Sequence, residues 1–182
     1  MKKILKTLKG LKIFLRPIRP ADLSLLRAWH NDKRLARLTA RDRRRSVSAR
    51  EQKRWLSRLK RRKDTLQWVV CVRPSGKRIG KAGLWRVDVR RKKAELGLFV
   101  ARVGARRRGC GTEIVRLLAG HAFGSMALRR LEARVSPGNK ASMKFFERCG
   151  WIKKKKRSGK STDAVYRFEP PSARAARRRS RP

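Results

Sequence analysis

The chain has 182 residues, 40% of them hydrophobic, which suffices for one domain with a hydrophobic core. Its 55 Lys and Arg residues stand against 12 Asp and Glu, so the formal net charge is +43. Charge of this density repels itself, and we expect polyanionic partners: nucleic acid, the ribosome, anionic lipid or phosphorylated ligands. Basic residues occur along the whole chain, so no single basic stripe marks a nucleic-acid footprint.

The composition also bears on the cellular compartment and on metal binding. Lys or Arg interrupts every apolar run, so we expect no transmembrane segment, and the basic start lacks a signal-peptide core. Cys71, Cys110 and Cys149 are odd in number and widely spaced, unlike a disulfide framework or a zinc site. We therefore expect a cytoplasmic, reduced protein that holds no metal.

The chain divides into three segments. Residues 1–11 form a basic leader. Two interpretations of it remain open: a short amphipathic helix over residues 2–12, or a frayed, solvated segment without regular structure. A single domain should occupy residues 12–169. Residues 170–182 are rich in Arg and bounded by Pro, which is typical of a disordered tail.

In chain order, the domain should begin with a strand at 12–18, followed by two helices. Pro20 suits the first turn of the first helix. The second helix should begin at Ser48, because Ser48 and Glu51 have the spacing of a capping box.

The remaining elements alternate between strands and helices. We expect strands at 66–72, 78–87 and 94–101, a helix at 112–123, a strand at 131–135, a helix at 139–149 and a strand at 164–168. A helix between two strands favours an α/β (α+β) fold class.

One segment has the pattern of an anion-binding site. The strand at 95–101 leads into a loop with Gly109 and Gly111, which opens directly into the next helix. Unpaired amides and the helix dipole attract anions at such a terminus, and three arginines (Arg106, Arg107, Arg108) add positive charge. The pattern predicts a pyrophosphate cradle. It lacks the Gly-Lys-Ser/Thr ending of a nucleotide P-loop, and a Gly-x-Gly loop alone could be an ordinary tight turn.

The spacing Arg106-x-x-Gly109-x-Gly111 after a strand resembles the acetyl-CoA signature of the GNAT superfamily of N-acetyltransferases. The segment from Asn139 to Phe146-Glu147-x-x-Gly150-Trp151 is similar to the superfamily's second signature. Residues 15–18, 29–32, 79–80 and Asp88 resemble the branch with ribosomal-protein N-terminal acetyltransferases and amino-sugar-nucleotide acetyltransferases. The resemblance covers residues 12–157. It implies a mixed central sheet with a splayed fourth strand and helices on both faces.

The resemblance implies acetyl-CoA as the co-substrate. Its pantetheine arm would run along the splayed strand, its pyrophosphate would lie on the loop amides, and Asn139 would bind the arm. The cofactor-binding residues expected on this basis are Phe99, Val100, Ala101, Arg106, Arg107, Arg108, Gly109, Cys110, Gly111, Thr112 and Asn139.

The implied chemistry is direct attack of an uncharged primary amine on the thioester, with a strand amide near Phe99 or Val100 stabilising the oxyanion. Glu95 is the best candidate for the base, although an ion pair with a neighbouring cation is an equally good interpretation. Phe146 stands where the family usually has the acid tyrosine and cannot donate a proton. Ser142 is a candidate substitute, against the simpler interpretation of a surface serine; the thiolate can also leave unassisted.

The charge bears on the acceptor, since a +43 protein should repel polyamines and aminoglycosides. A nucleotide-linked amino sugar is the preferred acceptor, and the N-terminus of a protein, ribosomal or other, is the alternative. A closed pocket would favour the first and an open groove the second. A non-catalytic RNA- or ribosome-binding protein on the same fold is the rival from another class, motivated by the basic run 153–157, the Arg-rich tail and Phe146.

Overall fold

The computed structural model describes residues 5–38, 46–154 and 163–170. The expected tail, apart from Pro170, and the end of the basic run 153–157 lie outside these ranges. Among the helices that are described, none is both long and apolar enough to cross a membrane.

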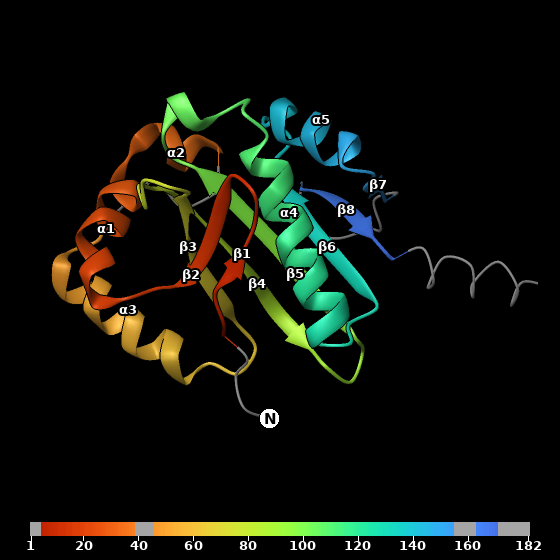
Figure 1. The fold of residues 1–182 in the computed structure, drawn as a ribbon, viewed down its shortest axis with the longest axis horizontal. Coiled ribbons are helices and arrows are strands. Elements are labelled where there is room, and N and C mark those ends of the chain that lie inside the picture. Colours follow the sequence, from red (N-terminus) through yellow and green to blue (C-terminus); the bar gives the residue numbers. More distant parts are fainter. Residues whose placement is uncertain (1–4, 39–45, 155–162, 171–182) are drawn as a thin grey trace, which may run out of the picture.

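An eight-stranded sheet in the order β1-β2-β3-β4-β5-β6-β8-β7 forms the centre of the molecule (Figure 1). The strands are β1 (Leu8–Lys9), β2 (Ile13–Pro17), β3 (Leu66–Val72), β4 (Arg78–Asp88), β5 (Lys93–Val100), β6 (Arg130–Val135), β7 (Ile152–Lys153) and β8 (Ala164–Phe168). β5 and β6 are parallel, whereas the other neighbouring strands of the described chain are antiparallel. The predicted mixed sheet is confirmed.

The parallel strands β5 and β6 separate along their length. Residues 93–95 of β5 have partners in β6, whereas β5 stays paired with β4 as far as Val100. The edge of β5 beyond Glu95 is therefore open toward β6. After β2, β3 and β4, this is the fourth long strand of the chain, and its divergence is the splay that the sequence resemblance implies.

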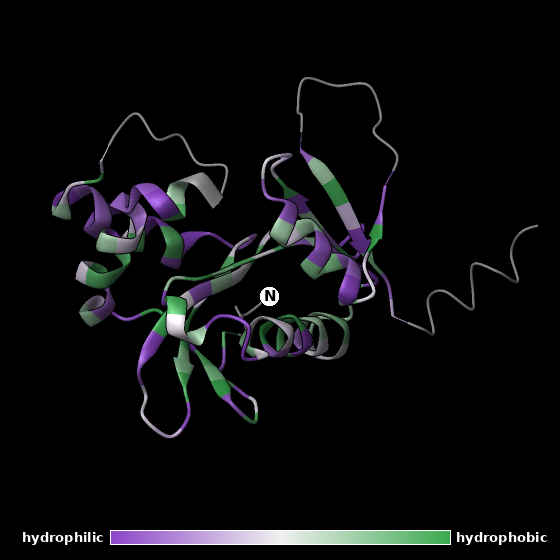
Figure 2. Ribbon diagram, turned by 90° about the horizontal axis from the view of Figure 1, so that it is seen from above, coloured by the Kyte–Doolittle hydropathy of each residue, from purple (hydrophilic) through white to green (hydrophobic). Residues whose placement is uncertain are grey.

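Helices cover both faces of the sheet, as expected (Figure 2). They are α1 (Leu23–Asn31), α2 (Lys33–Leu38), α3 (Ala49–Arg61), α4 (Cys110–Gly120) and α5 (Lys140–Arg148). Neighbouring residues of a strand point to opposite faces. Trp68 and Val70 of β3 therefore join the core that includes α4, whereas Val69 and Cys71 join a second core with α1 and α3.

The helix considered for residues 2–12 is not formed at Leu8–Lys9, which pair with β2 instead. The indole N–H of buried Trp68 donates to the carbonyl of Lys6 at 2.8 Å, and Leu8 enters the core. A short isolated helix is marginal in water, whereas strand pairing satisfies the backbone and buries Leu8. The sheet therefore begins before residue 12, within the expected leader.

Local signals account for where the helices begin. At the start of α3 the Ser48 hydroxyl accepts from the Glu51 amide at 3.2 Å, and the Glu51 carboxylate accepts from the Ser48 amide at 2.8 Å. The capping box is thus confirmed. Helix α2, which the sequence analysis did not predict, begins after Asp32, whose carboxylate accepts from the Arg34 amide at 2.8 Å.

A buried ion pair joins β2, the 3-10 turn Pro20–Asp22 and β4. Asp22 is 1% exposed and receives two hydrogen bonds of 2.7 Å from Arg16, one of 3.2 Å from Arg78 and one from the Arg19 amide. Burial raises the pKa of the Asp22 carboxyl, but the hydrogen bonds from Arg16 and Arg19 outweigh it and hold the pKa below its usual value.

Candidate functional site

The loop between β5 and α4 turns through two left-handed residues. Arg107 has φ +58° and Gly109, at the cap position of α4, has φ +80°. Glycine adopts this conformation without the cost of about 1–2 kcal/mol that a Cβ imposes. The cap residue supplies no side-chain hydrogen bond, so the first-turn amides of α4 remain available to an anion.

The two glycines of this loop have different roles. A Cβ on Gly111 would lie 3.1 Å from the ring of Phe145, so this glycine lets α5 pack against the start of α4. The Arg106 guanidinium donates from Nε to the carbonyl of Val100 at 3.0 Å and thereby ties the loop to the end of β5. In the Gly-x-Gly pattern, Gly109 therefore concerns the approach of a ligand, whereas Gly111 concerns helix packing.

The cradle is anchored from the other side by the β1–β2 turn. Lys12 donates from Nζ to the carbonyl of Arg108 at 3.2 Å. The carboxylate of Glu113, in the first turn of α4, accepts from the amides of Leu11 and Lys12. Sequence reasoning missed Glu113. Its partner Lys12 is 101 residues away along the chain, so their contact leaves no local signal in the sequence.

A cleft of about 1470 Å³ lies at the divergence of β5 and β6. It brings together ten of the predicted residues: Glu95, Phe99, Val100, Arg106, Arg107, Gly109, Gly111, Thr112, Asn139 and Ser142. The lining that the structure describes does not include Ala101, Arg108 or Cys110. Arg108 and Cys110 instead line a second cavity behind the loop.

Backbone direction distinguishes the two amides considered for the oxyanion. The Ala101 amide donates to the carbonyl of Ile79, so it points toward β4. Backbone groups alternate along a strand, and the Phe99 amide must point the same way while the Val100 amide faces the open edge. The Phe99 side chain packs edge-on against Trp29, with ring centroids 5.9 Å apart.

The start of α5 forms the opposite wall of the cleft. Asn139 caps the helix, since its Oδ1 accepts from the Ser142 amide at 3.0 Å. The Asn139 side chain is thus fixed at the start of α5, next to Ser142. Phe146, one turn further along, is 4% exposed and packs with Phe145 and Trp151.

The single tyrosine of the chain does not replace the missing acid. Tyr166 is fully buried and stacks on Phe146, with ring centroids 6.0 Å apart. Its hydroxyl donates to the Glu147 carboxylate at 2.9 Å, and burial together with Glu147 raises the pKa of Tyr166 to about 12. It lies outside the described lining of the cleft, so its contribution is to the aromatic core.

At the other end of the cleft the wall is cationic. Glu95 is the only acidic side chain in the described lining, and it pairs with Arg86 at 2.8 Å and with Arg134 at 3.1 Å. Lys81 is buried, donates to Gln67 at 3.0 Å and lies over the ring of Trp55. Glu95 therefore forms the ion pairs that the sequence analysis considered. Its carboxylate also lies in the cleft, where a base is expected.

Trp85 forms an aromatic floor at this end. A Cβ on Gly83 or on Gly97 would lie 3.0 Å from its ring, so these two glycines of neighbouring strands make room for the indole. Sequence reasoning missed Trp85, although glycines inside strands are a signal of such close packing. Asp88, part of the family resemblance, serves a turn, where its carboxylate accepts from the Arg91 amide at 2.8 Å.

Solved structures share the overall fold of this chain. Mycobacterium smegmatis RimJ in complex with CoA-disulfide superposes with a TM-score of 0.77 at 19% identity, covering 93% of this chain and 90% of that one. Vibrio cholerae spermidine N-acetyltransferase in complex with CoA and spermine superposes with a TM-score of 0.73 at 15% identity, covering 86% of this chain and 93% of that one. A Vibrio cholerae protein provisionally assigned as a ribosomal-protein-serine acetyltransferase superposes with a TM-score of 0.75 at 17% identity, covering 93% of this chain and 100% of that one. These likenesses define the fold as that of acetyltransferases.

The sequence defines the family more closely. Residues 12–152 match the model of the acetyltransferase (GNAT) domain, whereas no curated protein matches the chain in sequence. The chain belongs to the GNAT family of acetyltransferases and is an N-acetyltransferase that uses acetyl-CoA as co-substrate. The left-handed Gly109, the free first turn of α4 and the open edge of β5 fit the pyrophosphate and the pantetheine arm of that co-substrate.

Proposed function

We propose that this N-acetyltransferase acetylates the N-terminal amine of a protein. One observation carries the proposal: the cationic end of the cleft offers a single carboxylate, Glu95, beside the indole of Trp85. One carboxylate suits one ammonium group, and an aromatic floor suits the first residue of a peptide. Among the fold neighbours, the protein provisionally assigned as a ribosomal-protein-serine acetyltransferase supports a protein acceptor by its name.

The size of the cleft also supports an extended acceptor. About 1470 Å³ exceeds the range of about 300–1000 Å³ that is usual for one small-molecule ligand. The lining includes Thr112 at the cradle, Trp85 on β4, Leu35 on α2 and Arg62 after α3. Acetyl-CoA and the first residues of a peptide can therefore occupy the cleft together.

A nucleotide-linked amino sugar is the second candidate, and the cations at the acceptor end favour it. Arg86 and Arg134 pair with Glu95, and Lys81 and Arg62 also line the cleft. A diphosphate would be attracted to such a group of cations. Polyamines fit less well, because their several ammonium groups would meet this wall with only one carboxylate to bind.

The proposed chemistry assigns a role to three groups of this chain. Glu95 accepts the ammonium proton of the acceptor, directly or through water, and leaves the amine uncharged. The Val100 amide stabilises the oxyanion, because it faces the open edge of β5. The Ser142 hydroxyl donates a proton to the departing thiolate and recovers one from the attacking nitrogen, which loses its second proton as the amide forms. Acetyl-CoA supplies the activated acetyl group.

The test is CoA release, measured with a thiol reagent, from acetyl-CoA and four acceptors. These are an acidic hexapeptide, the same peptide with a blocked N-terminus, a UDP-linked amino sugar and spermidine. We expect turnover with the free peptide, none with the blocked one, and a rate that falls as salt screens the cationic wall. Turnover with the amino sugar alone would establish the second candidate, and turnover with spermidine alone would contradict both.

The polyanion association expected from the net charge of +43 is a separate proposal. Binding of RNA or ribosomes that weakens steeply with salt would support it. Such binding would concentrate the enzyme where new N-termini emerge.

A further inference from the structure

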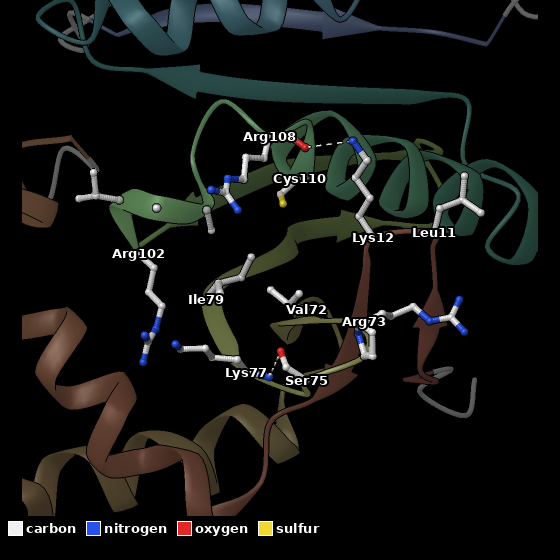
Figure 3. Close-up of a pocket in the computed structure, with 14 residues that line it drawn as sticks. Leu11, Lys12, Val72, Arg73, Ser75, Lys77, Ile79, Arg102, Arg108 and Cys110 are labelled. Atoms are coloured by element: carbon white, nitrogen blue, oxygen red, sulfur yellow. Dashed lines mark hydrogen bonds between the residues drawn. The ribbon is translucent and has the colours of Figure 1, made fainter.

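A second cavity, of about 760 Å³, lies behind the cradle loop and outside the acetyl-CoA cleft (Figure 3). It is enclosed by the β1–β2 turn, the β3–β4 hairpin and the loop that leads to α4. Its volume is within the usual range for one small-molecule ligand. The cleft already described accounts for acetyl-CoA and the acceptor, so this cavity has no assigned ligand.

The charges around the cavity have one sign. Five cations line it, namely Lys12, Arg73, Lys77, Arg102 and Arg108, and its described lining holds no carboxylate. Lys12 and Arg73 already donate to backbone carbonyls. Figure 3 shows the ends of Lys77 and Arg102 directed toward one another, with Arg108 on the opposite wall. Three cations of this kind offer charge-assisted hydrogen bonds to a phosphate group.

The floor and the rim of the cavity are apolar. Ile79 and Val72 form the floor, and Cys110 joins them from α4 (Figure 3). At the rim, Leu11 is 86% exposed and Val103 is 68% exposed. Large exposed aliphatic side chains beside a cavity favour a ligand that has an apolar part.

The loop between β5 and α4 separates the two sites. Arg106, Arg107 and Gly109 line the acetyl-CoA cleft, whereas Arg102 and Arg108 line the second cavity. The arginines of one loop are thus divided between two anion-attracting spaces. A ligand in the second cavity would contact the back of the cradle without entering the cleft.

We propose that the second cavity binds a small phosphorylated molecule with an apolar body, at the same time as acetyl-CoA occupies the cleft. The phosphate lies against Lys77 and Arg102, and the apolar body covers Val72 and Ile79 toward Arg108. Apolar surface and charge each contribute to the affinity, so a ligand that has both binds more tightly than either part alone.

The probe is n-hexyl phosphate, titrated by calorimetry into the full-length protein saturated with acetyl-CoA, beside inorganic phosphate and hexanol. We expect hexyl phosphate to bind at least about tenfold more tightly than either of the other two probes. Lys77→Ala and Arg102→Ala should each weaken it about tenfold. Arg116→Ala is the matched control, because Arg116 is exposed on α4 and lines neither site; it should change the affinity less than twofold.

Three results would overturn the proposal. Saturation with acetyl-CoA could abolish hexyl phosphate binding, which would place the probe in the cofactor cleft. Inorganic phosphate could bind as tightly as hexyl phosphate, which would leave the apolar floor without a role. Arg116→Ala could weaken binding as much as Arg102→Ala, which would reduce the effect to the overall charge of the protein.

Discussion

At the residue scale, Glu95 and Glu132 form a natural comparison. They are Cα partners across β5 and β6, each is 25% exposed, and each pairs with two arginines. Glu95 lines the cleft, whereas Glu132 is outside its described lining. The two positions therefore separate the chemical role of a carboxylate from its role in an ion pair.

We expect Glu95→Gln to lower kcat/KM for the amine by about 100-fold, because the ammonium proton loses its acceptor. The rate should recover partly at high pH, where more of the amine is already uncharged. Glu132→Gln should retain nearly full activity, and acetyl-CoA affinity should be unchanged in both variants. Equal losses in the two variants would show that the Glu95 ion pairs, rather than proton transfer, are what the reaction needs.

Ser142 has a matched control in Ser136, since both serines line the cleft. Loss of a proton donor for the thiolate should lower kcat about tenfold or more in Ser142→Ala, without a change in the KM for acetyl-CoA. Ser136→Ala should leave kcat close to its original value. An unchanged kcat in Ser142→Ala would mean that water protonates the thiolate.

Sequence reasoning could propose residues for the cradle, and Glu95 at the acceptor end, but it could not find the partners of Glu95. Arg106, Gly109 and Asn139 belong to segments whose spacing is local, so one sequence reveals them. The ion pairs of Glu95 reach Arg86 on β4 and Arg134 on β6, and only the folded sheet brings these side chains together. The same limit hid Glu113.

At the element scale, the strands and helices were predictable where a β-prone run or a helix cap is visible in the sequence. Strands β3 and β8 have the expected limits, and α3 begins at its capping box. The predictions of secondary structure fail where tertiary contacts determine the conformation. Leu8–Lys9 form a strand because they pair with the edge of β2. Helix α2 is too short for its periodicity to stand out.

The buried Asp22 is expected to make stability depend on pH. Its pKa is lowered in the folded state, so its contribution is complete above the unfolded value of about 3.9 and is lost as the pH falls through the lower folded value. Asp22→Asn should cost about 3 kcal/mol at pH 7, because Arg16 loses its partner. The measurement is the free energy of unfolding in urea at several pH values.

The pH dependence and a control variant show whether the loss of stability in Asp22→Asn is electrostatic. The variant and the original protein should converge in stability once the pH falls below the lowered pKa of Asp22, where both side chains are neutral. Asp64→Asn is the control, since its pair with Arg62 is exposed and should cost less than about 1 kcal/mol. A difference for Asp22→Asn that persists unchanged at low pH would contradict an electrostatic origin.

At the scale of the whole molecule, the charge of +43 is the dominant property. Repulsion among 55 basic residues opposes the compact state, and anions that bind the folded protein should relieve it. We therefore expect the Tm to rise more in sodium sulfate than in sodium chloride of equal ionic strength. Equal shifts would indicate simple screening rather than anion binding.

The central claim is that the loop before α4 holds acetyl-CoA, and calorimetric titration of acetyl-CoA tests it most directly. The original protein should bind, and Gly109→Glu should abolish binding, since it puts a bulky, negatively charged side chain at a left-handed position of an anion-binding loop, with its Cβ 3.4 Å from Lys12 Nζ. Gly104→Glu is the control, because a Cβ there meets no atom within 4 Å and Gly104 lies outside the described lining of the cleft; it should still bind. Equal binding by the original protein and Gly109→Glu would contradict the account.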